Sequence, residues 1–233
     1  MFKNGMIWVV LSVFFNISIS ASERTFFSFT PANFSKQLSQ KTVRQVYQDS
    51  TGYLWFVTQE GLSRYDGYQL LKFVHDPRDP DSISSDNVRS ILEDNQKRLW
   101  IATDGGGLNR FEPLSQTFTK WRAGGEKSQS IISDQIRSMY LASDGTIWLG
   151  YNNGSFSRLK QNDMKFEHFN TRELLPELTK NAFVTSIAED KHYIWLATDG
   201  NGLLQFNKDT YQLKRYFKGG VSPLFSDRLT EVF

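Results

Sequence analysis

The chain has 233 residues, of which 39% are hydrophobic and 15% aromatic, and its 27 Lys and Arg residues nearly balance its 25 Asp and Glu residues. This composition is sufficient for a sizeable core and excludes a disordered chain, and the dispersed charges form no basic stripe of the kind that binds nucleic acid. The chain contains no cysteine, so disulfides, thiolate metal sites and a cysteine nucleophile are excluded.

The first 21 residues have the pattern of a secretory signal peptide. Lys3 precedes an apolar run at residues 6–15, and small residues suited to a signal peptidase follow as far as Ala21. The run is much shorter than the roughly 20 residues that span a bilayer. We therefore favour export with cleavage after Ser20 or Ala21 over a permanent membrane anchor, and we expect a lead-in segment at residues 22–38.

A repeat then occupies the rest of the chain. Trp55, Trp100, Trp148 and Trp195 are separated by 45, 48 and 47 residues, and each lies in a similar segment. A strand rich in Val and Ile precedes each tryptophan, and an aromatic strand follows it. Each unit is predicted to form four short strands, with Asp, Asn and Gly at the turns. Four strands with a period in the mid-forties are typical of a β-propeller blade.

The predicted fold class is all-β: a β-propeller of four complete four-stranded blades plus the first strand of a fifth, which leaves an incomplete ring. The boundaries that we predict are 39–82, 83–130, 131–178 and 179–222 for the four blades, and 223–233 for the start of blade 5. Because 225–232 aligns with the opening strands of blades 2 and 3, we interpret the chain as an N-terminal fragment. A natural ring of four or five blades is the alternative.

The repeated tryptophans and glycines have structural explanations. A tryptophan on the second strand can fill the gap to the next blade and remove about 150–250 Å² from water, so we expect it to pack and not to bind ligand. Turn chemistry explains Gly61, Gly107 and Gly202. The segments 104–107 and 199–202 are poor phosphate or calcium loops, because a strand follows each of them and the carboxylates of an EF-hand are missing.

The sequence around each repeated tryptophan resembles that of a known family. The pattern Leu/Ile-Trp-x-x-Thr-x-x-Gly-Leu-x-Arg-Tyr/Phe resembles the two-component regulator propeller repeat, and residues 52–68 and 75–82 are similar to the first blade of such sensors. The resemblance runs from about residue 39 to the end. The third unit departs from it at Tyr151 and at residues 155–156, which predicts a distorted hairpin or a loop adapted for contact.

The resemblance implies a periplasmic sensor region of a receptor in the inner membrane. In that family, further blades, an immunoglobulin-like domain and a transmembrane helix lead to a cytoplasmic histidine kinase or diguanylate cyclase, and the complete receptor can be a dimer. The missing C-terminal blades and output module are therefore expected partners of this chain.

No catalytic, cofactor-binding or metal-binding constellation is recognisable. His75, His168 and His192 lack metal-ligand spacing, and nucleophile, kinase and cyclase signatures are missing. The acidic pairs at residues 93–94 and 189–190 recur at one position of the repeat, which indicates turn structure and not acid–base catalysis. We expect no enzymatic activity and no cofactor in this chain, and a propeller hydrolase or oxidoreductase is the disfavoured hypothesis.

Ligand contacts are expected among the non-repeating residues near the central channel and the faces of the ring, because the fold accounts for the repeating ones. The candidates, whose aromatic, amide and guanidinium groups suit a small molecule or an oligosaccharide, are Trp121, Arg122, Tyr151, Asn152 and Asn153. For Trp121, packing on an outer strand is the favoured alternative. The leading hypothesis is the ligand-sensing input domain of a bacterial transmembrane receptor. The alternative is a stand-alone secreted propeller that binds carbohydrate or protein.

Overall fold

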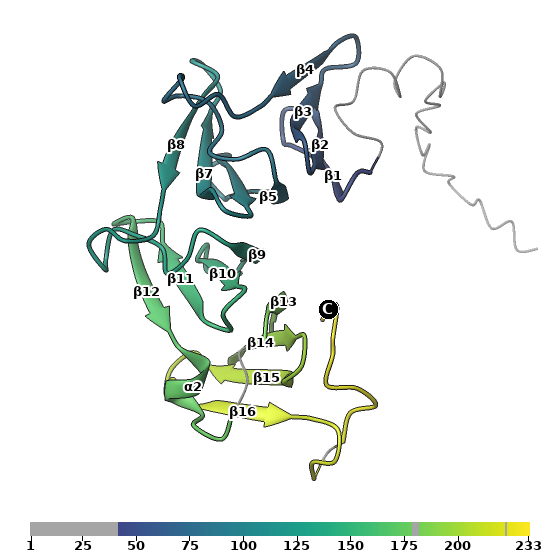
Figure 1. The fold of residues 1–233 in the computed structure, drawn as a ribbon, viewed down its shortest axis with the longest axis vertical. Helices are drawn as coiled ribbons and strands as arrows, with labels where there is room; N and C mark the ends of the chain where they lie inside the picture. The colour runs from purple at the N-terminus through teal and green to yellow at the C-terminus, as the bar shows by residue number, and fades with distance from the viewer. Residues whose placement is uncertain (1–41, 179–181, 222) are drawn as a thin grey trace, which may run out of the picture.

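The structure is a computed structural model that describes residues 42–178, 182–221 and 223–233. The predicted signal peptide at 1–21 and lead-in segment at 22–38 lie outside the described residues. Four antiparallel four-stranded sheets follow one another along the chain, and in each sheet consecutive strands are neighbours. The sheets fan out as blades from a common centre, with β1, β5, β9 and β13 innermost (Figure 1). The prediction of an all-β propeller with four complete blades and an incomplete ring is confirmed.

The strands of each blade are short, as the closely spaced turn residues predict. Blade 1 contains β1 (Gln45–Gln48), β2 (Leu54–Thr58), β3 (Gly61–Tyr65) and β4 (Leu70–Phe73). Blade 2 contains β5 (Val88–Glu93), β6 (Leu99–Thr103), β7 (Gly107–Glu112) and β8 (Thr117–Trp121). Blade 3 contains β9 (Ile136–Leu141), β10 (Ile147–Tyr151), β11 (Phe156–Lys160) and β12 (Lys165–Phe169). Blade 4 contains β13 (Val184–Glu189), β14 (Tyr193–Thr198), β15 (Gly202–Asn207) and β16 (Leu213–Tyr216).

A short helix, α2 (Thr171–Leu174), interrupts the connection between blades 3 and 4. Asn170 caps it, because the side chain of this residue accepts a hydrogen bond from the backbone N–H of Arg172. In the part of the chain that the structure describes, no helix has the length and apolar character needed to span a bilayer.

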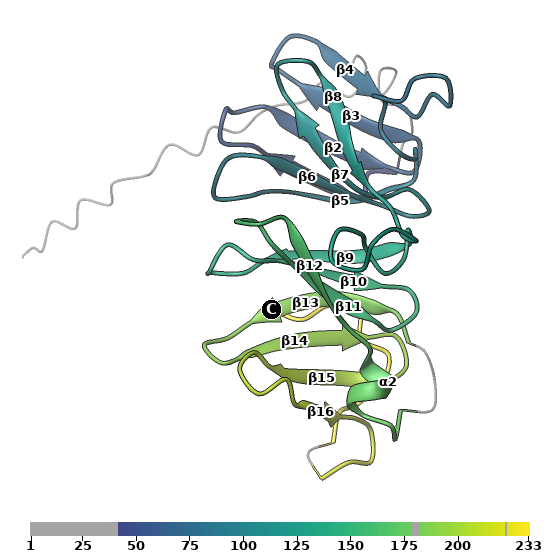
Figure 2. The same ribbon diagram turned by 90° about the vertical axis from the view of Figure 1, so that its left-hand side faces the viewer.

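The hydrophobic core lies between the blades, which stand side by side in Figure 2. The ring of Trp55 in blade 1 is fully buried and meets Phe111 of blade 2 edge-on, with ring centroids 5.2 Å apart. Trp148 of blade 3 meets Phe206 of blade 4 in the same way at 5.8 Å. Burying such rings removes apolar area from water at about 25 cal/mol per Å², which makes these contacts the main attraction between blades.

Trp195 differs from its three counterparts because it is only half-buried. Its neighbours Ile194 and Leu196 point toward blade 3 and belong to the core shared by blades 3 and 4. Since successive side chains of a strand point to opposite faces, Trp195 points to the outer face of blade 4, where no described blade covers it.

The predicted first strand of a fifth blade is not formed, and a fifth blade is not confirmed. Residues 223–233 contain one isolated bridge, between Asp199 and Arg228. They still follow the rim of blade 4, because the carbonyl of Asp227 accepts hydrogen bonds from Gly200 and Gly202 at 2.9 and 2.8 Å. A segment of strand needs a partner strand to complete its ladder, and the described residues provide none here.

Candidate functional site

A β-bulge at the start of the innermost strand shapes the inner edge of three blades. In blade 2, Val88 pairs with Thr103 and Ser90 pairs with Ala102, which leaves Arg89 as the extra residue. The same shift leaves Arg137 unpaired in blade 3 and Thr185 in blade 4. Bulges bend a strand locally and redirect a side chain, and they are enriched beside functional sites.

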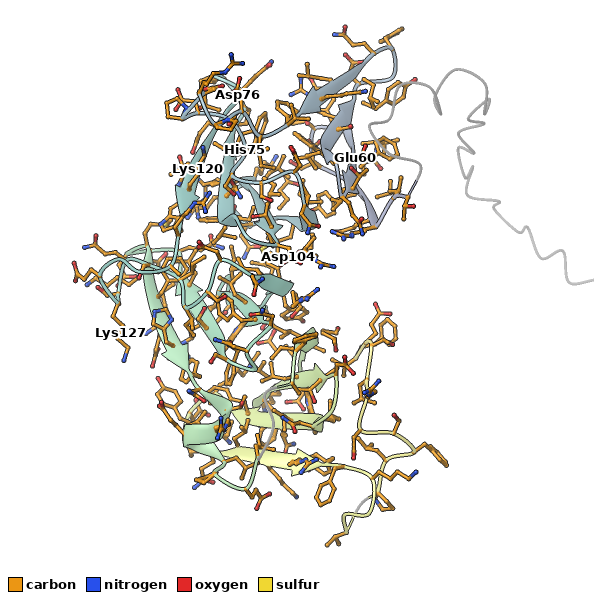
Figure 3. The ribbon with its side chains drawn as sticks, in the orientation of Figure 1. Glu60, His75, Asp76, Asp104, Lys120 and Lys127 are labelled. Atoms are coloured by element: carbon orange, nitrogen blue, oxygen red, sulfur yellow. The ribbon has the colours of Figure 1, made fainter. Side chains whose placement is uncertain are left out.

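Two arginines at these bulges share one carboxylate. Arg89 donates a very short hydrogen bond from Nη2 to Oδ2 of Asp104, and Nη1 of Arg137 lies 3.7 Å from the same oxygen. Asp104 belongs to the β6–β7 turn and lies at the inner edge of the arc, where Figure 3 labels it. Backbone bridging between Asp104 and Gln135, at the entry to blade 3, holds this turn in place.

Arg44 stands at the corresponding place in blade 1. Its Nη1 donates to Oδ1 of Asn87 and to the carbonyl of Val88, each at 2.7 Å. Burial and the positive charges of Arg89 and Arg137 lower the pKa of the Arg44 guanidinium, against the opposing effect of Asp104. The three guanidinium groups are therefore close enough to repel one another.

These arginines were missed as candidates in the sequence. The three segments Val-Arg-Gln, Val-Arg-Ser and Ile-Arg-Ser recur at the same position of the repeat, but recurrence alone indicates a strand of the fold. The bulges that direct the Arg89 and Arg137 side chains away from the regular pleat depend on pairing between strands, which the repeat pattern does not specify.

Of the five residues that the sequence singled out, Tyr151 lies in the core and does not reach the surface. It is fully buried between blades 2 and 3, and its hydroxyl lies 2.7 Å from Oγ of Ser157. Burial raises the pKa of this phenol despite the hydrogen bond. In blades 1, 2 and 4 the residue at the position of Tyr151 is a threonine. The hydroxyl of that threonine donates to the backbone carbonyl of the glycine that begins the third strand and so closes the turn between the second and third strands.

Trp121 and Arg122 lie at the end of the outer strand of blade 2. The Trp121 ring packs on Trp100 with centroids 5.2 Å apart and is partly buried. Arg122 is about half-exposed, but its guanidinium donates to the carbonyl of Ser84 at 3.2 Å and lies 3.5 Å from the carboxylate of Asp134. Both side chains therefore have packing or hydrogen-bonding roles within the blade.

Asn152 and Asn153 form the β10–β11 turn at the same end of the strands as Asp104. The Asn152 amide donates a very short hydrogen bond to Oε1 of Gln135, and Gln135 in turn bridges to Asp104. Asn153 accepts a hydrogen bond from the backbone of Ser155 at 3.0 Å. Through Gln135, the Asn152 amide is therefore connected to Asp104 and to the two arginines that share its carboxylate.

A groove of about 600 Å³ opens at the opposite end of the strands, between blades 2 and 3. It is lined by the β5–β6, β9–β10 and β11–β12 turns, including Gln96, Thr146 and Asn162. Its cation Arg158 is paired with Glu167 at 2.7 Å. The groove is large enough for a small polar molecule, but its best-placed cation is already paired within the protein.

The acidic residues at the turn between the first and second strands of blade 2 accept hydrogen bonds that stabilise the fold. Asp94 accepts hydrogen bonds from the backbone of Gln96 and Arg98 and from the Trp100 indole. Glu93 accepts hydrogen bonds from the backbone N–H and hydroxyl of Ser50 in blade 1, both at 2.7 Å. In the described ranges, no three His, Cys, Asp or Glu side chains gather as a metal site.

Two segments of the repeat match a known protein family. The family model described as two component regulator propeller matches residues 82–105 and 130–153, which contain the inner strands and the second strands of blades 2 and 3. Blades 2 and 3 therefore contain repeats of the two-component regulator propeller type. A protein named histidine kinase P4 from Formosa agariphila is 38% identical over 82 residues, which are 34% of this chain and 6% of that protein.

Solved structures of similar fold come from extracellular domains of B. thetaiotaomicron. One, assigned to a hybrid two-component system, has a TM-score of 0.71 at 24% identity over 80% of this chain and 26% of that chain. Another, assigned to a one-component system, has a TM-score of 0.51 at 18% identity, covering 84% of this chain and 32% of that one. The chain therefore spans a third or less of those structures and 6% of the histidine kinase.

Proposed function

We propose that the chain is the extracytoplasmic, ligand-sensing propeller region of a bacterial transmembrane signal-transduction receptor, a two-component sensor histidine kinase or a diguanylate cyclase. The observation that carries the proposal is the run of propeller repeats in register, two of which match the two-component regulator propeller model. The signal-peptide pattern of residues 1–21 supports export to the periplasm.

The geometry suits an input region. Rigid blades with buried interfaces hold the turns at the inner edge in fixed positions, and the partly exposed charges there can contact a solute. A ligand that binds one arrangement of the blades better than another shifts the equilibrium between them, and a linked output module can respond to that shift. Binding is the activity that we assign to this region.

The coding sequence beyond the codon for Phe233 tests the proposal. We predict further propeller blades, a membrane-spanning helix and then a kinase or cyclase module in the same reading frame. A reading frame that stops directly after this region would favour a stand-alone secreted binding module and would overturn the receptor proposal.

A further inference from the structure

We propose that the inner edge of blades 1 to 3 holds a site for an oxyanion, the carboxylate or sulfate group of a small solute, with Arg137 as its anchor and with Arg89 and Arg44 beside it. The inference deepens the proposed function and rests on it for the expectation that this region receives a small ligand.

The charges at this edge are unbalanced. Three guanidinium groups, on Arg44, Arg89 and Arg137, act on one another and on Asp104, the one carboxylate that forms ion pairs with them among the described residues. Three positive charges against one negative charge leave an excess of two. Such an excess, held on partly buried groups, attracts an anion more strongly than the same charges dispersed in water.

Arg137 has hydrogen-bond donors to spare. Its guanidinium makes no side-chain hydrogen bond to any residue that the structure describes, and its Nε is buried without an acceptor. Its central carbon lies 4.7 Å from the centroid of the Phe183 ring, a cation–π contact that restricts the movement of the guanidinium. An arginine held in this way presents a rigid pair of N–H groups that matches a carboxylate or a sulfate.

Arg89 is engaged only in part. Its Nη2 binds Asp104, whereas its Nε is buried and has no acceptor. Because the Asp104 carboxylate is committed to Arg89, it leaves Arg137 only a long contact of 3.7 Å. An incoming oxyanion would supply the close acceptor that Asp104 does not give to Arg137 in this arrangement.

The structural role of the bulge does not require arginine. In blade 4 the bulge residue is Thr185, whose hydroxyl donates to the backbone carbonyls of Ala197 and Leu229 at 3.1 and 2.7 Å. A short side chain therefore satisfies the same fold position. The arginines of the other blades exceed what the backbone needs, which favours a binding role.

The site is accessible and has neutral groups beside it. The side chains of Arg89 and Arg137 are 23% and 25% exposed. Phe183 is 39% exposed, and the partly exposed Asn152 lies on the same rim. A ring and an amide next to the anion-binding groups suit the neutral body of a small polar solute.

Calorimetric titration of the purified chain with D-glucuronate, glucose 6-sulfate and D-glucose tests the inference. D-glucose shares the sugar body but lacks the charge, and the two acids distinguish a carboxylate site from a sulfate site. We expect at least one acid to bind at least about tenfold more tightly than D-glucose. Equal or absent binding of all three solutes to the wild-type chain would overturn the proposal without any variant.

Two variants assign the binding to this edge. Arg137→Gln should weaken binding of the acid at least about tenfold. Arg110→Gln is the control, because Arg110 is about as exposed as Arg137 but pairs with Glu112 on blade 2. This variant should bind the acid as tightly as the wild-type chain. Equal loss in both variants would indicate a general charge effect and contradict the site. Arg137→Lys, which keeps the charge without the planar fork, replaces Arg137→Gln if that variant does not fold and should weaken binding as well. If none of the solutes binds, the oxyanion site is wrong but the receptor proposal is unaffected, because the coding sequence beyond Phe233 tests that proposal separately.

Discussion

Oδ2 of Asp94 accepts a hydrogen bond of 2.7 Å from the indole Nε1 of Trp100, six residues later in the same hairpin. The pair recurs at 2.7 Å between Asp49 and Trp55. The hydrogen bond joins the turn to the tryptophan that fills the space between blades. The aspartate therefore holds both the backbone of the hairpin and the indole that packs between the blades. In blade 3 the corresponding position is Ala142, and the structure gives Trp148 no such partner.

Asp94→Ala should destabilise the chain by about 2–3 kcal/mol, because the buried indole N–H and two backbone N–H groups lose their acceptor. Chemical denaturation followed by tryptophan fluorescence measures the change. Asp144→Ala is the matched control. That exposed carboxylate accepts one hydrogen bond, from the backbone of Thr146, and its loss should cost less than about 0.5 kcal/mol. Equal losses would show that the indole hydrogen bond is unimportant.

Ala142→Asp should supply the missing acceptor for Trp148. The turn is already alike, since the N–H of Ala142 donates to the carbonyl of Thr146 as that of Asp94 donates to the carbonyl of Arg98. We expect a gain of up to about 1 kcal/mol in the free energy of unfolding. Ala142→Leu, which adds bulk without an acceptor, should destabilise the chain by about 1–3 kcal/mol. A loss of the same size in both variants would contradict the prediction.

Stability should decrease in acid. Burial alone would raise the pKa of Asp94, but the hydrogen bonds from Trp100 and Arg98 outweigh it and lower the pKa below the ordinary value. For Glu189, burial likewise opposes the hydrogen bond from Lys208, and its pKa is also lowered. A lowered pKa stabilises the fold above the unfolded value of about 4, and this contribution is lost as the pH falls through the folded pKa.

Urea unfolding at pH values between 3 and 7 tests this expectation. The free energy of unfolding should be nearly constant above about pH 5 and decrease below about pH 4. The slope should be smaller in Asp94→Ala, because this variant lacks one of the responsible groups. An identical slope in the variant would assign the acid sensitivity to other residues.

Gly107 and Gly105 provide a matched pair in one turn, with φ values of +79° and +91°. A Cβ at position 107 would clash with the carbonyl oxygen of Trp121 and meet Cδ1 of Ile131 at 2.8 Å, whereas at position 105 it would meet nothing within 4 Å. Gly107→Ala should therefore cost about 3 kcal/mol or more, and Gly105→Ala about 1 kcal/mol from backbone strain alone. Thermal melting of the two variants measures the difference, and similar melting temperatures would contradict the packing seen here.

The sequence was sufficient to predict the blades because period, turn residues and tryptophans all repeat. It was less informative where blades meet. Tyr151 is a ligand candidate in the sequence because it departs from the repeat, yet a departure can equally fill a core, and this residue is buried between blades. Arg137 repeats and so gives no signal in the sequence, although a bulge between two strands places it at the inner edge. Both outcomes depend on contacts between segments that a one-dimensional pattern does not contain.

A role in sensing extracytoplasmic ligands requires that the propeller lies outside the cytoplasm, and a reporter fusion tests this location directly. Alkaline phosphatase without its own leader, fused after Phe233, becomes active only when it is exported. We predict high phosphatase activity for residues 1–233 and none for residues 22–233, which lack the predicted signal peptide. An inactive fusion with the complete chain, produced in equal amount and found in the cytoplasm, would contradict a role in sensing extracytoplasmic ligands.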